Sequence, residues 1–303
     1  MTDGKKLGGI ISALVTPFDT DEKLAETLIP SLVAFQLGQG IDGFYVGGST
    51  GEAFLQSVEE RARCLKAVAE ANDGKALLIA HVGAIATAES IALARTAADA
   101  GYDAISAVPP FYYDFTASEL INHFKALATA TPLPVIVYNF GGKVPKMTGE
   151  LIMALLDDHR FAGIKHTSTD LYQLERFKRH RPDVAIFNGY DEMCLAGLAM
   201  GADGAIGTTY NFMGDLFIDL RRAFLDGRMK DALRLQQAAN RVIDVLVEVG
   251  VFPGTKALLR LMGQDAGSCR RPFGDLAPES RQRLESCLAQ LRMDRTDGRA
   301  SAA

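Results

Sequence analysis

The sequence predicts an α/β fold, a closed (β/α)8 barrel of the TIM type with a helical extension at its C-terminus. Three observations support this prediction. Short apolar segments of strand length occur eight times, amphipathic stretches of helical period separate them, and one loop pattern recurs where a helix gives way to the next strand. Such alternation is typical of parallel sheets that are covered by helices.

The eight apolar segments have the length and the boundaries of buried strands. Most are apolar on both faces, as parallel strands under helices are. We place them at residues 10–15, 43–46, 77–81, 104–108, 135–138, 162–165, 185–188 and 204–207. Their carboxyl ends recur about every 27 residues, which leaves room for one strand, one helix and two loops.

Three loops share a glycine, an aspartate two residues later, and then a small residue. They are Gly40-Ile41-Asp42-Gly43, Gly101-Tyr102-Asp103-Ala104 and Gly201-Ala202-Asp203-Gly204. The first glycine suits the left-handed position that ends a helix, and the aspartate makes local turn hydrogen bonds. An open doubly wound sheet is the alternative. Eight regular units favour closure, and no GxGxxG fingerprint opens a helix.

The chain beyond the eighth unit carries helical patterns and no strand signal. We therefore expect a catalytic barrel over residues 1–225 and a C-terminal helical bundle over 226–293, with helices at 229–248, 253–262 and 278–292. The polar, small residues at 294–303 predict a disordered tail.

The composition is that of a globular chain with a sizeable core. Hydrophobic residues make up 48% and charged residues 23% of the 303, and the formal net charge is −5, which gives no footprint for nucleic acid. No apolar stretch approaches the ~20 residues that span a bilayer. Four cysteines without CxxC spacing and a start without a secretion signal predict a cytoplasmic protein with reduced thiols. The five histidines lack metal-ligand spacing, so we expect no protein-held metal.

Lys165 is the most informative residue, because it ends the apolar segment Phe161-Ala162-Gly163-Ile164. Burial disfavours an ammonium, so the pKa of this lysine should fall. A neutral amine attacks ketones and forms Schiff bases. The alternative is a strand-end lysine whose charged end reaches solvent.

Other polar residues follow the strands at the face where barrel enzymes place their active sites. The loop 46–53 brings Ser49 and Thr50 to the start of a helix, where free N–H groups and hydroxyls suit a carboxylate. A structural glycine turn with Ser49 as a helix cap is the alternative. A phosphate would also fit, although the P-loop lysine is absent.

Tyr138 ends the fifth strand and is a candidate for proton transfer near Lys165, or alternatively a buried tyrosine with a satisfied hydroxyl. Asp191 and Glu192 follow the seventh strand. They either accept hydrogen bonds from a polyhydroxylated ligand or balance the dipole of the next helix.

Together these segments resemble the Schiff-base aldolase family that includes N-acetylneuraminate lyase and dihydrodipicolinate synthase. The shared marks are GGSTGE at 47–52, YN at 138–139 and GIKHTS at 163–168, and the resemblance spans nearly the whole barrel. The segments DLYQ at 170–173, NGYDE at 188–192 and GTTYN at 207–211 are most similar to the lyase members.

The resemblance implies a carbon–carbon lyase that cleaves N-acetylneuraminate to pyruvate and N-acetylmannosamine without an external cofactor. Lys165 would form the imine, and Tyr138 would assist proton transfer. Ser49 and Thr50 would hold the pyruvate carboxylate. The resemblance implies that the sugar-derived chain would be held by Thr167, Gly189, Asp191, Glu192 and Thr208. It also implies a homotetramer in which Tyr112 or Tyr113 would form a subunit contact.

Two departures from the family pattern concern specificity. Position 208 is threonine, where the lyases usually have serine, and Tyr138-Asn139 is followed by Phe140-Gly141-Gly142-Lys143, where a proline is usual two residues after the asparagine. Dihydrodipicolinate synthases usually carry an arginine in this loop that binds the carboxylate of the second substrate. No arginine lies between Asn139 and Glu150, which argues against the synthase. The alternatives are an aldolase or dehydratase for another 2-keto-3-deoxy sugar acid or 2-oxo acid, dihydrodipicolinate synthase, and a non-catalytic pyruvate- or sialate-binding regulator.

Overall fold

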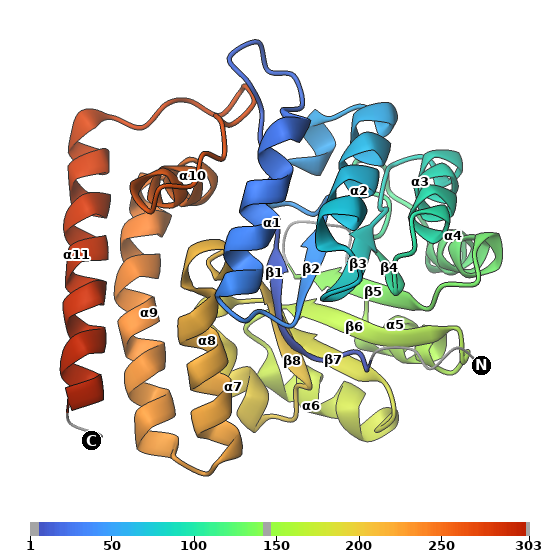
Figure 1. The fold of residues 1–303 in the computed structure, drawn as a ribbon. Coiled ribbons are helices and arrows are strands. Elements are labelled where there is room, and N and C mark those ends of the chain that lie inside the picture. The colour runs from blue at the N-terminus through green and yellow to red at the C-terminus, as the bar shows by residue number, and fades with distance from the viewer. Residues whose placement is uncertain (1–5, 142–146, 301–303) are drawn as a thin grey trace.

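A closed barrel of eight parallel strands forms the centre of the molecule, with each strand paired to its neighbours in chain order (Figure 1). The computed structural model describes residues 6–141 and 147–300. The strands are β1 Gly9–Ala13, β2 Gly43–Val46, β3 Leu77–His81, β4 Ala104–Ala107, β5 Val135–Phe140, β6 Phe161–Thr167, β7 Ala185–Asn188 and β8 Gly204–Gly207. This confirms the predicted fold class.

Most strands lie where the sequence predicts them, and β5 and β6 run longer. Their polar ends read as loop in the sequence, but they pair with each other, Asn139 opposite His166 and Phe140 opposite Thr167. The ladder therefore continues past Tyr138 and Lys165, which are also opposite each other. This pairing places the two candidate catalytic residues on adjacent strands at the same height in the barrel.

Helices surround the barrel and extend it on one side. They are α1 Ile29–Gly38, α2 Val58–Asn72, α3 Thr87–Asp99, α4 Ala117–Ala130, α5 Gly149–Leu156, α6 Leu171–His180, α7 Cys194–Ala199, α8 Tyr210–Leu225, α9 Met229–Val249, α10 Val251–Leu261 and α11 Pro278–Ala300, with short 3-10 turns η1 Glu26–Leu28, η2 Ala53–Leu55 and η3 Asp191–Met193. No helix in the described part of the chain combines the length and the hydropathy needed to cross a membrane.

The barrel interior and the helical layer have separate apolar clusters because side chains alternate along each strand. Ile11, Tyr45 and Phe187 belong to the interior cluster. Ile10, the neighbour of Ile11, packs outward with α8 and the C-terminal helices.

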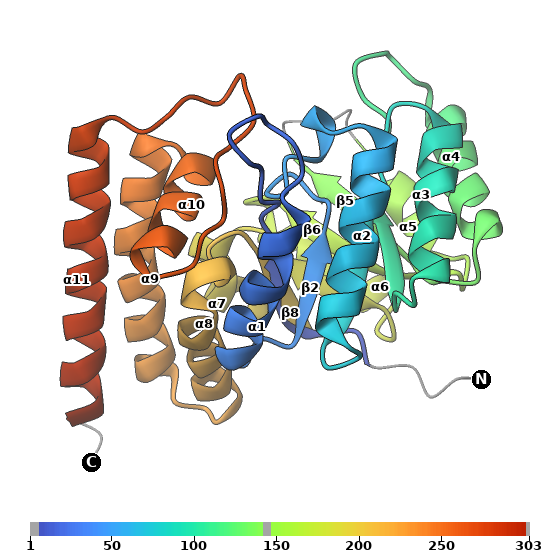
Figure 2. The same ribbon diagram turned by 45° about the horizontal axis from the view of Figure 1, so that its top comes forward.

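Helices α9 and α10 pack against α8 beside the barrel, and α11 packs on α9 and α10 as the outermost helix (Figures 1 and 2). Ala239 of α9, Leu258 of α10 and Leu284 of α11 share one buried cluster with α7 and α8. The expected helical extension is therefore joined to the barrel by a common core. Helix α11 continues to Ala300 through most of the segment predicted to be a disordered tail, since no proline follows Pro278 to end it.

Candidate active site

A cavity of about 740 Å³ opens at the carboxyl ends of the strands and brings the predicted site residues together. Side chains of α9, α10 and the segment before α11 form its outer wall. The predicted residues that line it are Ser49, Thr50, Tyr138, Lys165, Thr167, Gly189, Asp191, Glu192 and Thr208. Three other strand-end residues, Thr16, Glu52 and Asn139, do not line it.

Lys165 lies at the bottom of the cavity and is 5% exposed. Its Nζ is 4.2 Å from the ring centroid of Tyr45 and 4.3 Å from that of Tyr138. Burial lowers the pKa of Lys165 to about 7, and the negative charge of Asp191 opposes that fall. About half of the amine is therefore uncharged at pH 7, against about one in 10³ for an ordinary lysine. The side chain is a nucleophile at neutral pH.

Tyr138 presents its phenol beside this amine. Burial raises the pKa of Tyr138 to about 12, although the neighbouring hydroxyls of Thr167 and Ser49 act in the opposite direction. The ring stacks on Phe140, with 5.5 Å between centroids and 6° between planes. At neutral pH the group is a phenol, which donates one proton and accepts another rather than acting as a free phenolate.

Asn139 and His166 belong to the same two sequence motifs but face away from the cavity. The Asn139 amide donates to His166 Nδ1 at 3.0 Å and to the Gln173 side chain at 3.2 Å. His166 Nε2 then donates to the Asp170 carbonyl at 3.0 Å. These bonds join β5, β6 and α6 and hold the backbone that carries Tyr138 and Lys165.

The glycine-rich turn presents two hydroxyl residues to the cavity. Thr50 Oγ1 lies 2.7 Å from Thr208 Oγ1, so the turn after β2 is joined to the loop after β8. Within the described residues, the backbone N–H groups of Ser49 and Thr50 donate no hydrogen bond. A Cβ at Gly48 would lie 2.7 Å from the Tyr45 ring, so only glycine fits there. Free N–H groups and hydroxyls in one turn suit a carboxylate.

Asp191 is buried and Glu192 is exposed in the segment after β7, which also lines the cavity. The Thr209 N–H and hydroxyl both donate to Asp191 Oδ2 at 2.7 Å. Burial nevertheless raises the pKa of Asp191 to about 6, against the effect of Thr209 and the positive charge of Lys165. The Asp191 carboxylate is thus fixed in position and charged at neutral pH.

Gly189 and Thr167 meet at the wall between these groups. A Cβ at Gly189 would lie 1.9 Å from Thr167 Oγ1, which excludes every other residue from this position. The buried Thr167 hydroxyl has no hydrogen-bond partner of normal geometry in the described part of the chain. This hydroxyl lies beside the Tyr138 phenol at the cavity wall, where a ligand can complete its hydrogen bonding.

Sequence reasoning missed two aromatic residues beneath the turn. Tyr45 points into the barrel and donates to Ser106 Oγ at 3.1 Å. The buried ring of His81 lies between backbone groups, with Nδ1 2.8 Å from the Gly47 carbonyl and Nε2 accepting from the Val108 N–H at 3.3 Å. Both His81 nitrogens are therefore engaged, and burial keeps its pKa well below the ordinary value. Both residues lie in strands that are buried along their whole length, so the sequence pattern does not distinguish them from ordinary core.

Tyr112 and Tyr113 do not line the cavity. They are 85% and 60% exposed on the loop between β4 and α4, and Tyr112 adopts a positive φ of 79°. Their rings contact each other edge to face at 5.0 Å. Two large aromatic side chains are thus held outward on the surface of the chain.

The fold and the cavity define an aldolase-type barrel enzyme that carries a nucleophilic lysine at the carboxyl end of its sixth strand. The described residues contain no group of histidine, cysteine, aspartate and glutamate side chains suited to a metal ion. Comparison with known families agrees with this class. Residues 6–291 match the model of the dihydrodipicolinate synthetase family, and the chain belongs to that family.

Individual relatives narrow the comparison. The chain is 55% identical over 287 residues to N-acetylneuraminate lyase of Rhizobium meliloti, covering 95% of this chain and 94% of the relative. Among solved structures, the Clostridium difficile protein CdNal in complex with mannosamine superposes with a TM-score of 0.92 at 31% identity, covering 95% and 100% of the two chains. A catalytic lysine mutant of Ruminococcus gnavus sialic acid aldolase superposes with a TM-score of 0.93 at 28% identity, covering 97% and 99%.

Proposed function

We propose that this enzyme cleaves N-acetylneuraminate to pyruvate and N-acetylmannosamine through a Schiff base on Lys165. The observation that carries the proposal is the buried amine of Lys165, whose pKa is lowered to about 7 at the bottom of the strand-end cavity. The high identity to a relative of that name over nearly the full length of both chains supports the choice of substrate.

The reaction begins when uncharged Lys165 attacks the ketone carbon of the open-chain substrate. A bond forms between Nζ and this carbon, and the ketone oxygen leaves as water after it has been protonated. The protonated imine that results attracts electrons from the neighbouring carbon–carbon bond. The faces of Tyr45 and Tyr138, each just over 4 Å from Nζ, stabilise the positive charge that develops there.

Cleavage requires removal of a proton from the substrate hydroxyl beside the scissile bond. Because the pKa of Tyr138 is raised to about 12, its phenol acts as a relay that passes this proton to the substrate carboxylate. The electrons of the O–H bond form the aldehyde, and those of the C3–C4 bond form an enamine on Lys165. Protonation at C3 and addition of water then release pyruvate and the free lysine.

The rest of the cavity is assigned by what its groups offer. Ser49 and Thr50 hold the carboxylate with hydroxyls and free N–H groups. The wall formed by the segments after β6, β7 and β8 holds the hydroxylated chain of the substrate. Its residues are Thr167, Gly189, Asp191, Glu192 and Thr208. The bond between Thr50 and Thr208 joins the carboxylate end of the site to this wall.

The lysine itself supplies the electron sink, so the proposed reaction uses no further cofactor. We propose that the enzyme works as a cytoplasmic homotetramer in which the outward-facing Tyr112 and Tyr113 contact a second subunit. Their exposure and their held conformation support this arrangement. The departure from the family pattern begins at Gly141, whose N–H donates to the Thr167 carbonyl at 3.1 Å, and residues 142–143 lie outside the described residues.

Relative turnover tests the choice of substrate. We expect kcat/KM for N-acetylneuraminate to exceed that for shorter 2-keto-3-deoxy acids by at least about tenfold, since the wall after β7 and β8 contacts only the longer chain. A Lys165→Ala variant that is folded by circular dichroism should be inactive on every acid. Preference for a shorter acid would show that the enzyme is an aldolase for another substrate. Activity of Lys165→Ala would refute the Schiff-base mechanism.

A further inference from the structure

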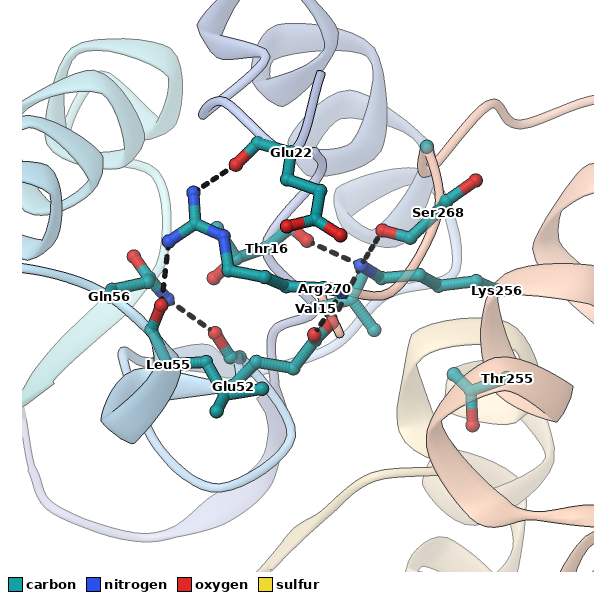
Figure 3. Close-up of polar contacts among 12 residues, drawn as sticks. Val15, Thr16, Glu22, Glu52, Leu55, Gln56, Thr255, Lys256, Ser268 and Arg270 are labelled. Atoms are coloured by element: carbon teal, nitrogen blue, oxygen red, sulfur yellow. Dashed lines mark hydrogen bonds and ion pairs between the residues drawn. The ribbon is translucent and has the colours of Figure 1, made fainter. Parts of the chain in front are cut away.

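Glu52 ends the glycine-rich motif, yet it turns away from the cavity and into the protein. Its side chain is fully buried and forms an ion pair of 2.7 Å with Lys256 of α10, whose side chain is 3% exposed. The second carboxylate oxygen accepts the backbone N–H of Arg270 at 2.8 Å. Both oxygens of Glu52 are therefore held by residues that follow it by about 200 positions (Figure 3).

Lys256 is bound as completely as Glu52. Its Nζ donates to the Thr16 carbonyl, to Glu52 Oε1 and to the Ser268 carbonyl, each at 2.7 Å (Figure 3). An ammonium has three N–H donors, so each of them has a partner. Thr16 follows β1, and the cation thus joins the loops after β1 and β2 to the C-terminal segment.

Further bonds brace the same turn. The Arg270 guanidinium binds both carboxylate oxygens of Glu60 at 2.7 and 2.9 Å and donates to the Leu55 carbonyl at 2.7 Å. The Gln56 amide donates to the Gly51 carbonyl at 2.6 Å. The turn is thus fixed from the side opposite to the cavity.

The backbone of Glu52 is itself strained. Its φ of 57° lies in the left-handed region, which is unfavourable for a residue with a Cβ. Its N–H donates to the Ser49 carbonyl at 3.0 Å, so this conformation closes the tight turn that presents Ser49 and Thr50. A strained conformation persists only where the surroundings hold it, and Lys256 and Arg270 supply that hold.

Helix α10 connects this anchor to the cavity. Phe252 lines the outer wall of the cavity and precedes Lys256 by one helical turn. One rigid element thus forms part of the wall and fixes the carboxylate turn at the same time. The helical extension therefore contributes residues to the cavity wall in addition to packing against the barrel.

We propose that Lys256 and the backbone of Arg270 position the Ser49–Thr50 turn through Glu52 and thereby set the affinity of the site for the carboxylate of a 2-oxo acid. We call Glu52, Lys256 and Arg270 the clamp. The inference rests on the proposed function, because it assigns the carboxylate to this turn. Since the contact is made in the bound substrate as well as in the transition state, loss of the clamp should act on binding more than on the chemical step.

Two clamp variants test this, Lys256→Met, which removes the ammonium and keeps an unbranched side chain one atom shorter, and Glu52→Gln, which keeps the shape of the side chain. The assay is borohydride trapping of the Lys165 imine across a range of pyruvate concentrations. We expect Lys256→Met to raise the half-saturating pyruvate concentration at least about tenfold, while the maximal trapping rate changes less than about threefold. Glu52→Gln should act in the same direction with a smaller effect.

The matched control is Arg283→Gln, which breaks the exposed ion pair between Arg283 and Glu248 in the same C-terminal helices. It should leave both trapping constants unchanged. Lys256→Arg keeps the charge and should restore part of the affinity that Lys256→Met loses. Should Lys256→Met fail to fold, Glu52→Gln and Lys256→Arg are compared with wild type in the same assay.

The outcomes separate this inference from the proposed function. A wild-type protein that forms no pyruvate adduct overturns the proposed function and this inference with it. Clamp variants that melt at a lower temperature but trap pyruvate with the wild-type half-saturation show a structural role alone, and they overturn this inference only.

Discussion

The titration of Lys165 is the property of the site that can be perturbed most cleanly. Burial lowers its pKa from 10.5 to about 7, which corresponds to about 5 kcal/mol against the charged amine. Asp191 works in the opposite direction, since its negative charge favours the ammonium. The Asp191→Asn variant removes that charge and should lower the pKa of Lys165 further.

The magnitude follows from the uncharged fraction of the amine. With a pKa of about 7, this fraction falls about tenfold between pH 8 and pH 6 and is level above pH 8, whereas an ordinary lysine would lose about a hundredfold over the same interval. In Asp191→Asn we expect the loss between pH 8 and pH 6 to shrink to less than about threefold.

The assay is the initial rate of pyruvate adduct formation, trapped with borohydride at each pH. Pyruvate lacks the sugar-derived chain, so the proposed contact of that chain with Asp191 does not enter. A wild-type rate that keeps rising to pH 10 would show an ordinary lysine. A profile that moves to higher pH in Asp191→Asn would refute the electrostatic reasoning.

Three further predictions concern other parts of the structure. Gly189→Ala places a Cβ 1.9 Å from Thr167 Oγ1 and should lower kcat/KM for cleavage by at least about tenfold, which steady-state kinetics will show; unchanged kinetics would mean that the wall does not contact substrate. Tyr138→Phe should still form the pyruvate adduct but lose about 10²-fold or more in cleavage, and equal losses in both steps would contradict a relay role. Burial lowers the pKa of His123 from 6.5 to about 4, so its contribution to stability is complete above pH 6.5 and is lost as the pH falls towards 4. Denaturant unfolding from pH 8 to pH 5 should therefore show a loss of stability to which His123 contributes about 2 kcal/mol, so His123→Gln should reduce the loss by about that amount, and an equal loss in this variant would exclude a contribution from His123.

The barrel was predictable because each unit repeats the same local signals. Apolar strands and glycine–aspartate loops recur along the chain, and the carboxyl ends of parallel strands must meet at one face. Lys165, Tyr138 and the Ser49–Thr50 turn were therefore brought together by topology alone. The sequence could not tell which strand-end residues face inward, and Asn139 and Glu52 do not line the cavity.

The parts that sequence reasoning missed depend on contacts between distant segments. Nothing near Lys256 or Arg270 in the sequence indicates a partner about 200 residues earlier, because the ion pair exists only once the C-terminal helices have packed on α8. Phe252 likewise joins the cavity wall through the packing of α10. Tyr45 sits inside an apolar strand, where its phenol looks like ordinary core.

The central claim is that the amine of Lys165 condenses with a 2-oxo acid. Incubation with pyruvate and borohydride, followed by peptide mass analysis, tests it directly. We expect a reduced carboxyethyl adduct on Lys165 alone, and none in Lys165→Ala. Recovery of unmodified protein, or an adduct on a different lysine such as Lys256, would contradict the account.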